Sequence, residues 1–220
     1  MQRTVPRKGH SSIMDAKITI IVVNWNGAMF LARCLAALMA QTTRVGEIVL
    51  VDNASSDGSI EIARQFPLVR IIALAENIGF AAANNLAIKA ADKTSDWIAF
   101  INPDAFAEPQ WLEKLLIAAQ SHPLFDAFGS KLVNAAQPTS LDGAGDAYHI
   151  SGRVWRIDHG APLAGHDEKT REVFSPCAAA ALYRRTVLQQ LGGFDEDYFC
   201  YLEDVDLGFR LRLAGYRCLY

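Results

Sequence analysis

Carboxylates are concentrated near the end of the chain. Within the twelve residues from 195 to 206 there are six: Asp195, Glu196, Asp197, Glu203, Asp204 and Asp206. Like charges that pack together raise one another's pKa, which suits a general base. The preference of a helix N-terminus for negative charge accounts for the first three. It accounts less well for Glu203 and Asp204, because the apolar pair Tyr201 and Leu202 directly precedes them, and we interpret Glu203 and Asp204 as catalytic.

A second set of acidic residues follows segments that read as strands. Asp52 comes directly after Val51, and Asp104 follows Pro103. A carboxylate at a strand end can accept hydrogen bonds from a base or a ribose, or hold Mg²⁺ or Mn²⁺ beside phosphates. Asp57 lies in a turn rich in helix-capping residues, and capping is its favoured interpretation. We interpret Asp52 as a ligand contact and Asp104 as a candidate metal ligand.

The elements that position these residues alternate regularly in the first 120 residues. Apolar runs of strand length occur at 17–23, 47–51, 69–74 and 97–101, and segments with helical spacing follow each of them. This alternation predicts βαβ units, and therefore an α/β fold with a mainly parallel central sheet flanked by helices. Polar residues follow each strand, so four loops converge at the carboxyl edge of the sheet, where such folds bind ligands.

The second half of the chain has a different rhythm. From about residue 124, glycines interrupt the pattern, which predicts irregular loops and short strands. The acidic segment then leads into a helix that ends near Gly215. We expect residues 1–16 to form a flexible tail and 17–220 to form one domain. Because Tyr220 falls where a further strand begins, we also expect this domain to be truncated at its C-terminus.

Composition and missing motifs exclude several classes. The 220 residues are 51% hydrophobic and 20% charged with a net charge of −3, so no global charge favours nucleic acid as a partner. The four cysteines form no CxxC pair, which indicates reduced thiols in a cytoplasmic protein. No GxGxxG motif follows the first strand, no P-loop is present, and no His/Cys spacing indicates zinc.

Five sequence stretches together resemble family 2 glycosyltransferases of the GT-A fold, particularly rhamnosyltransferase-like members from bacterial cell-surface polysaccharide pathways. The stretches read VVNWNG at 22–27, VDNASSDGS at 51–59, NIGFAAANN at 77–85, INPDA at 101–105 and GFDEDYFCYLEDVDLGFR at 193–210. They occur in the order found in that family. The resemblance implies an inverting transfer of a sugar from a nucleotide-diphosphate donor to an acceptor hydroxyl, with one base and no enzyme nucleophile.

The resemblance also implies roles for single residues. Asp204 corresponds to the general base, with Glu203 beside it, and Asp104 to the metal ligand of a DxD-like motif for Mg²⁺ or Mn²⁺. That motif here reads Asn102-Pro103-Asp104, so asparagine replaces its first acid. Asp52 is implied to contact a pyrimidine base, and Arg210 to lie near the diphosphate, although Arg210 is also spaced for an ion pair with Asp206. The sugar-nucleotide pocket is expected to include Asn24, Trp25, Asn77, Gly79, Asn84 and Asn85.

The implied partners are a dTDP-linked or UDP-linked sugar donor, with dTDP-rhamnose first, and a glycan or lipid-linked saccharide acceptor. The expected location is cytoplasmic, with peripheral association at the inner membrane face. A non-catalytic nucleotide-sugar binding domain is an alternative, because the first acid of the metal motif is missing and the chain stops at Tyr220. A sugar nucleotidyltransferase is a further alternative, disfavoured because residues 24–27 contain no lysine or arginine.

Overall fold

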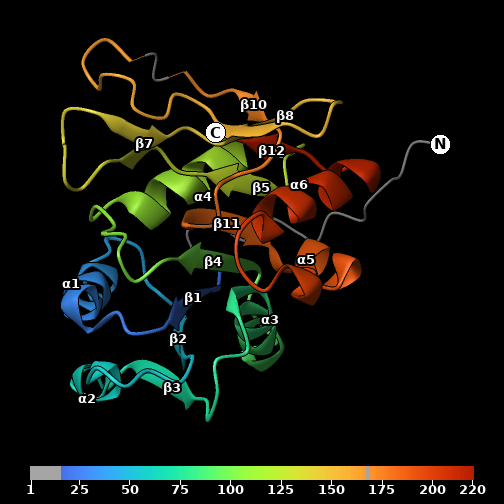
Figure 1. Ribbon diagram of the computed structural model, residues 1–220. Coiled ribbons are helices and arrows are strands. Elements are labelled where there is room, and N and C mark those ends of the chain that lie inside the picture. Colours follow the sequence, from blue (N-terminus) through green and yellow to red (C-terminus); the bar gives the residue numbers. More distant parts are fainter. Residues whose placement is uncertain (1–15, 167–168) are drawn as a thin grey trace.

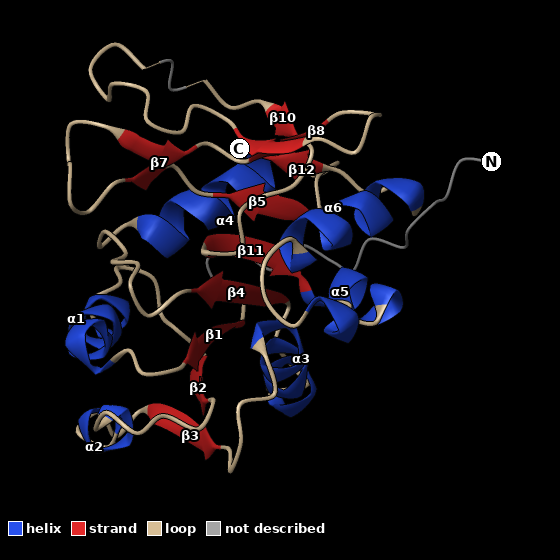
Figure 2. Cartoon of the chain, viewed as in Figure 1, coloured by secondary structure: helices blue, strands red, loops and turns tan. Residues whose placement is uncertain are grey.

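The computed structural model describes residues 16–166 and 169–220. The flexible tail predicted at 1–16 lies outside these ranges, apart from Ala16. Within them, an eight-stranded sheet of strand order β10-β12-β5-β11-β4-β1-β2-β3 lies at the centre, with helices on both faces (Figures 1 and 2). The predicted α/β architecture is confirmed.

The first half of the chain builds the parallel part of the sheet. Its strands are β1 (Ile18–Asn24), β2 (Glu47–Asp52), β3 (Val69–Ala73) and β4 (Trp97–Ile101). β1 pairs in parallel with β2 and with β4, and β2 pairs in parallel with β3. The connections contain α1 (Ala28–Met39), α2 (Ser59–Ala63) and α3 (Phe80–Ala90). All seven residues of β1 are buried, as its uninterrupted β-branched run predicts.

The second half of the chain extends the sheet with short strands. They are β5 (Ala127–Gly129), β10 (Glu172–Val173), β11 (Ala180–Arg184) and β12 (Cys218–Leu219). β11 lies antiparallel between β4 and β5. Two small hairpins, β6 (Leu132–Val133) with β7 (Leu141–Gly143) and β8 (Asp146–Tyr148) with β9 (Val154–Arg156), replace regular alternation here. The remaining helices are α4 (Trp111–Ser121), α5 (Arg185–Leu191), the short 3₁₀ helix η2 (Glu196–Tyr198) and α6 (Glu203–Leu213).

The sheet separates two hydrophobic cores. Successive residues of β1 point to opposite faces, so Ile20 belongs to the core under α1 and α4, whereas Ile21 belongs to the core under α3, α5 and α6. On the second face, Phe100 and Tyr183 pack edge to face with ring centroids 5.5 Å apart. In the part of the chain that the structure describes, every helix is too short or too polar to span a lipid bilayer.

Helix α6 lies unusually close to the segment before β11. A Cβ atom at Gly208 would be 2.5 Å from Cβ of Ser175, which is closer than real Cβ atoms approach. The Ser175 hydroxyl also donates a hydrogen bond of 2.7 Å to the carbonyl of Asp204 on α6. Glycine at position 208 therefore sets the distance between the first turns of α6 and the end of the sheet.

We expect Gly208→Ala to lower the free energy of unfolding by about 1–3 kcal/mol, because the added methyl group overpacks the contact with Ser175. Urea unfolding measures this loss. In a Ser175→Gly background the same substitution should cost clearly less, since the clashing Cβ is gone. An equal cost in both backgrounds would contradict this account of the close approach.

Candidate active site

Asn24 and Asp52 lie side by side at the carboxyl edge of the sheet. They are register partners at the ends of β1 and β2, and the side-chain amide of Asn24 donates to Oδ1 of Asp52 at 3.1 Å. Oδ2 of Asp52 accepts from the backbone N–H of Ser55 at 2.9 Å. Both side chains are fully buried, so Asp52 shapes the turn that follows β2 from inside. Trp25, the next residue after β1, is 60% exposed.

Asn53 joins the β2 loop to the β3 loop. Its amide nitrogen donates to Oδ1 of Asn77 at 2.8 Å and to the carbonyl of Gly79 at 3.2 Å, while its Oδ1 accepts from the N–H of Ile78 at 2.9 Å. Gly79 has a φ of +88°, which favours glycine. The predicted residues Asn77 and Gly79 therefore lie together, clamped by a side chain that the sequence analysis did not assign.

The two asparagines of α3 serve the fold in different ways. Asn84 donates from its amide to the carbonyl of Phe80 one turn earlier in the same helix. Asn85 accepts from the N–H of Phe194 and donates to its carbonyl, both at 2.8 Å, and also donates to the carboxylate of Glu196 at 3.0 Å. Asn85 thereby ties α3 to the segment that leads into α6.

That segment ends in a strained aromatic loop. Phe199, Tyr201 and Leu202 all have positive φ angles, which cost non-glycine residues on the order of 1–3 kcal/mol each. The carbonyl of Phe199 accepts the N–H of Phe80 at 2.6 Å and of Ala81 at 3.2 Å, at the N-terminus of α3. These bonds hold the loop in place although Tyr201 is 82% exposed.

The segment predicted to hold a metal, Asn102 to Asp104, follows β4. The backbone N–H of Asn102 donates to the carbonyl of Ala179 at 3.0 Å, so this end of β4 lies against the start of β11. Oδ1 of Asn102 is buried and has no hydrogen-bond partner among the described residues. Asp104, two residues later, is exposed. The motif thus presents two oxygen-bearing side chains without a second acid.

A cleft of about 270 Å³ opens between the end of β4, the β8–β9 hairpin and the start of α6. Its lining comes from segments that are far apart in the sequence: Phe80, Asn102, Asp146, Val154, Arg156, Cys177, Ala178, Ala179, Cys200, Tyr201, Leu202, Glu203, Asp204 and Val205. Of the residues predicted to form the site, this cleft brings together Glu203 and Asp204. Asp104 is not part of the lining, although Asn102, two residues before it, is. The predicted residues at the ends of β1 and β2 form a separate group.

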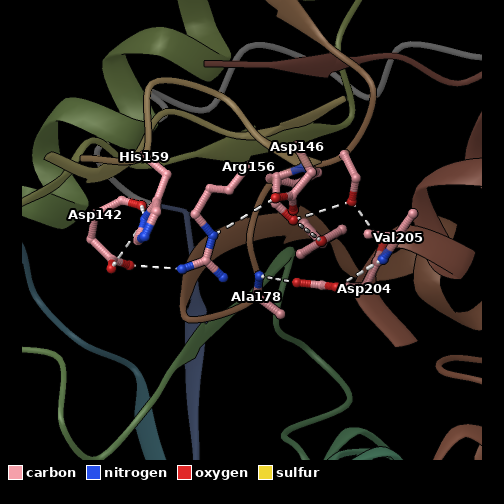
Figure 3. A network of polar contacts seen from close by, with 10 residues as sticks. Asp142, Asp146, Arg156, His159, Ala178, Asp204 and Val205 are labelled. Atoms are coloured by element: carbon pink, nitrogen blue, oxygen red, sulfur yellow. Dashed lines mark hydrogen bonds and ion pairs between the residues drawn. The ribbon is translucent and has the colours of Figure 1, made fainter. Parts of the chain in front are cut away.

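Asp204 is held in a defined orientation at the first turn of α6. Its Oδ2 accepts from the N–H of Ala178 at 3.0 Å, and its Oδ1 accepts from the N–H of Val205 at 2.9 Å (Figure 3). A carboxylate has about four lone-pair sites, so two remain for a ligand. Asp204 therefore combines a fixed position with free capacity to accept a hydrogen bond from a ligand hydroxyl.

Two further carboxyl groups in the cleft have strongly raised pKa values. Burial raises the pKa of the Glu203 carboxyl to about 7, and the negative charge of Asp204 adds to the effect. Glu203 is only 6% exposed, and its Oε2 has no hydrogen-bond partner among the described residues. Burial, then Asp204, likewise raises the pKa of Asp146 to about 7, against the opposing charge of Arg156.

Arg156 faces Asp146 across the β8–β9 hairpin. Its Nη1 donates to Oδ2 of Asp142 at 2.7 Å, and its Nε lies 3.8 Å from Oδ1 of Asp146 (Figure 3). A Cβ at Gly143 would lie 2.3 Å from Cδ of Arg156, so glycine at this position leaves room for the arginine side chain. The sequence analysis missed Asp146 and Arg156. The glycines just before Asp146 were the only signal, and they do not distinguish a site from a turn.

Asp146, Cys177 and Asp204 form a group that could hold a metal ion. One ligand atom from each lies within 4.8 Å of the others. Burial, then the charge of Asp204, raises the pKa of the Cys177 thiol to about 12, so a hard cation here would rely on the two carboxylates. Asp104 and Asn102, with a carboxylate and an amide oxygen, are the second group with chemistry suited to Mg²⁺ or Mn²⁺.

Arg210 lies apart from the cleft lining. Its Nε donates to Asp206 at 2.7 Å, and its Nη1 donates to the carbonyl of Leu191 at the end of α5 at 2.9 Å. The ion pair with Asp206 is the one that their i, i+4 spacing allows. The cation that lines the cleft is therefore Arg156 instead of Arg210.

We expect the free energy of unfolding to fall as the pH rises from about 4.5 to about 7, because folded Glu203 holds its proton more tightly than the unfolded chain does. Glu203→Gln removes this contribution. The variant should be more stable than the wild type above pH 7, on the order of 3 kcal/mol since one pKa unit corresponds to about 1.4 kcal/mol, and no more stable below pH 4.5.

Urea unfolding across this pH range, in buffer with EDTA, makes the measurement. Glu76→Gln is the matched control, because it removes an exposed glutamate. If Glu203→Gln and Glu76→Gln follow the wild-type pH dependence equally, the carboxyl of Glu203 is not held in a raised-pKa state.

Comparison with known proteins identifies the family. Residues 19–192 match the family described as "Glycosyl transferase family 2". The chain is 31% identical to the N-acetylglucosaminyl-diphospho-decaprenol L-rhamnosyltransferase of Mycobacterium tuberculosis, over 94% of this chain and 74% of that protein. It is 32% identical to the O-antigen biosynthesis protein RfbC of Myxococcus xanthus, over 91% of this chain and 16% of that protein.

Solved structures share the fold. The mannosyltransferase PcManGT from Pyrobaculum calidifontis, solved with GDP-Man and Mn²⁺, has a TM-score of 0.67 at 19% identity, over 93% of this chain and 55% of that one. GalNAc-T7, solved with UDP, GalNAc and Mn²⁺, has a TM-score of 0.73 at 16% identity, over 93% of this chain and 42% of that one. This chain thus spans about half the length of these structures. The predicted GT-A fold is confirmed, and the chain belongs to glycosyl transferase family 2.

Proposed function

We propose that this chain is an inverting glycosyltransferase that moves a sugar from a nucleotide-diphosphate donor to a saccharide acceptor in cell-surface polysaccharide synthesis. The observation that carries the proposal is the position of Asp204. Its carboxylate lies in the cleft, oriented by two backbone N–H groups, beside the end of β4 that bears the metal motif. Family membership supports the same reaction class.

In the proposed step, Asp204 takes the proton of the acceptor hydroxyl. The acceptor oxygen forms a bond to the anomeric carbon on the face opposite the diphosphate. The bond from that carbon to the diphosphate oxygen breaks, and its electron pair leaves with the diphosphate. One base is enough for this single displacement, because no covalent enzyme intermediate forms.

The nucleoside is assigned to the edge formed by the ends of β1, β2 and β3. Asn24, Asp52 and Asn77 lie there, and Asn53 clamps the loops together. Because Asp52 is fully buried and its oxygens already accept hydrogen bonds from Asn24 and Ser55, a base would reach its remaining lone pairs only after the loops that follow β1 and β2 move apart. We propose a dTDP-linked or UDP-linked donor at this edge.

Mg²⁺ or Mn²⁺ is the proposed cofactor, with Asp104 as its carboxylate ligand. The unpartnered Oδ1 of Asn102 is an oxygen donor beside it, and oxygen donors suit these cations. When bound, the ion would neutralise charge that develops on the departing diphosphate. Structural relatives solved with Mn²⁺ support this choice of ion.

The proposed donor sugar is rhamnose and the proposed acceptor a lipid-linked saccharide. The mycobacterial relative, which its name describes as acting on N-acetylglucosaminyl-diphospho-decaprenol, supports both. The corresponding location is cytoplasmic and peripheral at the inner face of the membrane. A non-catalytic nucleotide-sugar binding domain is the second candidate, which the asparagine at position 102 favours because it leaves one acid fewer for the metal.

Replacing the proposed base separates these two candidates. We expect Asp204→Asn to slow transfer from dTDP-L-rhamnose to a synthetic N-acetylglucosaminyl-diphospho-lipid by 10²- to 10⁴-fold, the range that general bases contribute. The dissociation constant for dTDP should change by less than about twofold, because Asp204 is assigned to the acceptor side.

Asp206→Asn is the matched control, since it alters an aspartate of the same helix that binds Arg210 away from the cleft. It should leave transfer nearly unchanged. Binding of dTDP without any transfer by the wild type would instead establish the non-catalytic candidate.

The metal assignment is tested by thermal shift with dTDP, UDP, GDP and NAD, each with and without Mn²⁺. We expect selective stabilisation by dTDP or UDP, of about 2.7 kcal/mol in total at a ligand concentration of 100 times its dissociation constant, and this stabilisation should be larger with Mn²⁺ than without it. Asp104→Ala should abolish the Mn²⁺ enhancement, and Asn102→Asp should increase it by restoring a second acid. Stabilisation by NAD alone would overturn the proposed function.

A further inference from the structure

We propose that Asp146 binds the acceptor sugar, by accepting a hydrogen bond from a second hydroxyl next to the one that reacts at Asp204. The two aspartates would then recognise a vicinal pair of hydroxyls on one sugar ring. This inference rests on the proposed function and adds a specificity-determining residue to it. It predicts that the acceptor must carry a free hydroxyl beside the reacting one.

The spacing of the two carboxylates fits such a pair. Ligand oxygens of Asp146 and Asp204 lie within 4.8 Å of one another in the same cleft. Two hydroxyl oxygens on adjacent ring carbons are about 3 Å apart, and each can donate over about 2.7 Å to a carboxylate oxygen. Each hydroxyl can thus meet its own carboxylate without movement of the backbone.

The backbone of Asp146 is hydrogen-bonded on both sides, whereas its carboxylate has only the ion pair of 3.8 Å with Arg156. Its N–H donates to the carbonyl of Ser175 at 2.8 Å, and its carbonyl accepts from the N–H of Phe174 at 3.1 Å. Its side chain is 7% exposed and lines the cleft, yet it accepts no hydrogen bond from the residues that the structure describes. A buried carboxylate without hydrogen-bond donors is costly to keep, which indicates that a ligand supplies them.

The need for a counter-ion does not explain this residue. Arg156 already has Asp142 at 2.7 Å, whereas its Nε is 3.8 Å from Asp146. Asp142 is 34% exposed in its side chain and lies outside the cleft lining. The pair with Asp142 is thus the closer of the two ion pairs of Arg156 that Figure 3 marks, and the carboxylate of Asp146 adds an acceptor group to the cleft.

The unpaired oxygen of Glu203 supports a polar ligand at the same place. Glu203 is more than nine-tenths buried, its Oε2 has no hydrogen-bond partner among the described residues, and it lines the same cleft. Asp146 and Glu203 thus bring two carboxyl groups that lack hydrogen-bond donors to the lining of one cleft, a lack that a polyhydroxylated ligand would satisfy.

The test is a set of singly deoxygenated acceptors. Synthetic N-acetylglucosaminyl-diphospho-lipids that lack the 3-, 4- or 6-hydroxyl are compared with the parent acceptor, using dTDP-L-rhamnose as donor. With the wild type, we expect one deoxy acceptor to be inert because it lacks the reacting hydroxyl. A second, lacking its neighbour, should lose about 10- to 100-fold in kcat/KM, as expected for a lost hydrogen bond to a charged group.

Asp146→Asn should lower kcat/KM for the parent acceptor by a similar factor. With that second deoxy acceptor the substitution should lower kcat/KM little further, because the hydroxyl that Asp146 would bind is already absent. The dissociation constant for dTDP should stay within about twofold of the wild type. Asp142→Asn is the matched control, since it also removes a carboxylate partner of Arg156, but one that lies outside the cleft lining. It should keep the wild-type acceptor pattern.

Several outcomes would overturn the inference. If every deoxy acceptor is either inert or fully active with the wild type, no second hydroxyl is recognised, whether or not Asp146→Asn folds. Equal losses in Asp146→Asn and Asp142→Asn would show that Asp146 acts through Arg156. Mn²⁺ binding without nucleotide that is lost in both Asp146→Asn and Cys177→Ser would assign the aspartate to a metal instead. Absence of transfer by the wild type to any acceptor overturns the proposed function itself, and the inference with it.

Discussion

The site depends on the hydrogen bond from the backbone N–H of Ala178 to the carboxylate of Asp204. This bond joins the first turn of α6 to the segment that enters β11, the strand next to the parallel half of the sheet. It forms only because α6 lies close, with Gly208 against Ser175 and the Ser175 hydroxyl on the carbonyl of Asp204. The proposed base is therefore placed by the main chain on both sides, which positions an acid more precisely than a long side chain in a loop does.

The two halves of the chain contribute different parts of the site for a topological reason. Parallel strands end at one edge, so the loops after β1, β2 and β3 meet there and amide side chains lock them together, as Asn53 does with Asn77. The antiparallel β11 runs the opposite way beside β4. Its beginning therefore meets the end of β4, which brings the Ala178 region next to Asn102. A ligand that contacts both the loops after β1, β2 and β3 and the region around Ala178 therefore has to cross the end of β4.

The sequence predicted the first half of this arrangement well and the second half poorly. Apolar runs of at least four residues predict buried parallel strands, and the polar residues after them, such as Asp52 and Asn77, follow from that. Strands β8 and β9 have three residues each, too few for a periodic pattern to show. Asp146 and Arg156 therefore could not be recognised. Arg210 shows the opposite case: its spacing from Asp206 allowed an ion pair, and the structure contains that pair, away from the cleft.

The acids in the cleft are held at a cost to stability. Glu203 and Asp146 both have pKa values raised to about 7, first by burial and then by the charge of Asp204. A fold selected for stability alone would replace such groups with apolar or amide side chains, because like charges in a buried space repel. The strained loop at Phe199, Tyr201 and Leu202, directly before Glu203, adds a backbone cost at the same place. Two carboxyl groups with raised pKa values and a strained loop that meet in one cleft are the mark of a site kept for chemistry.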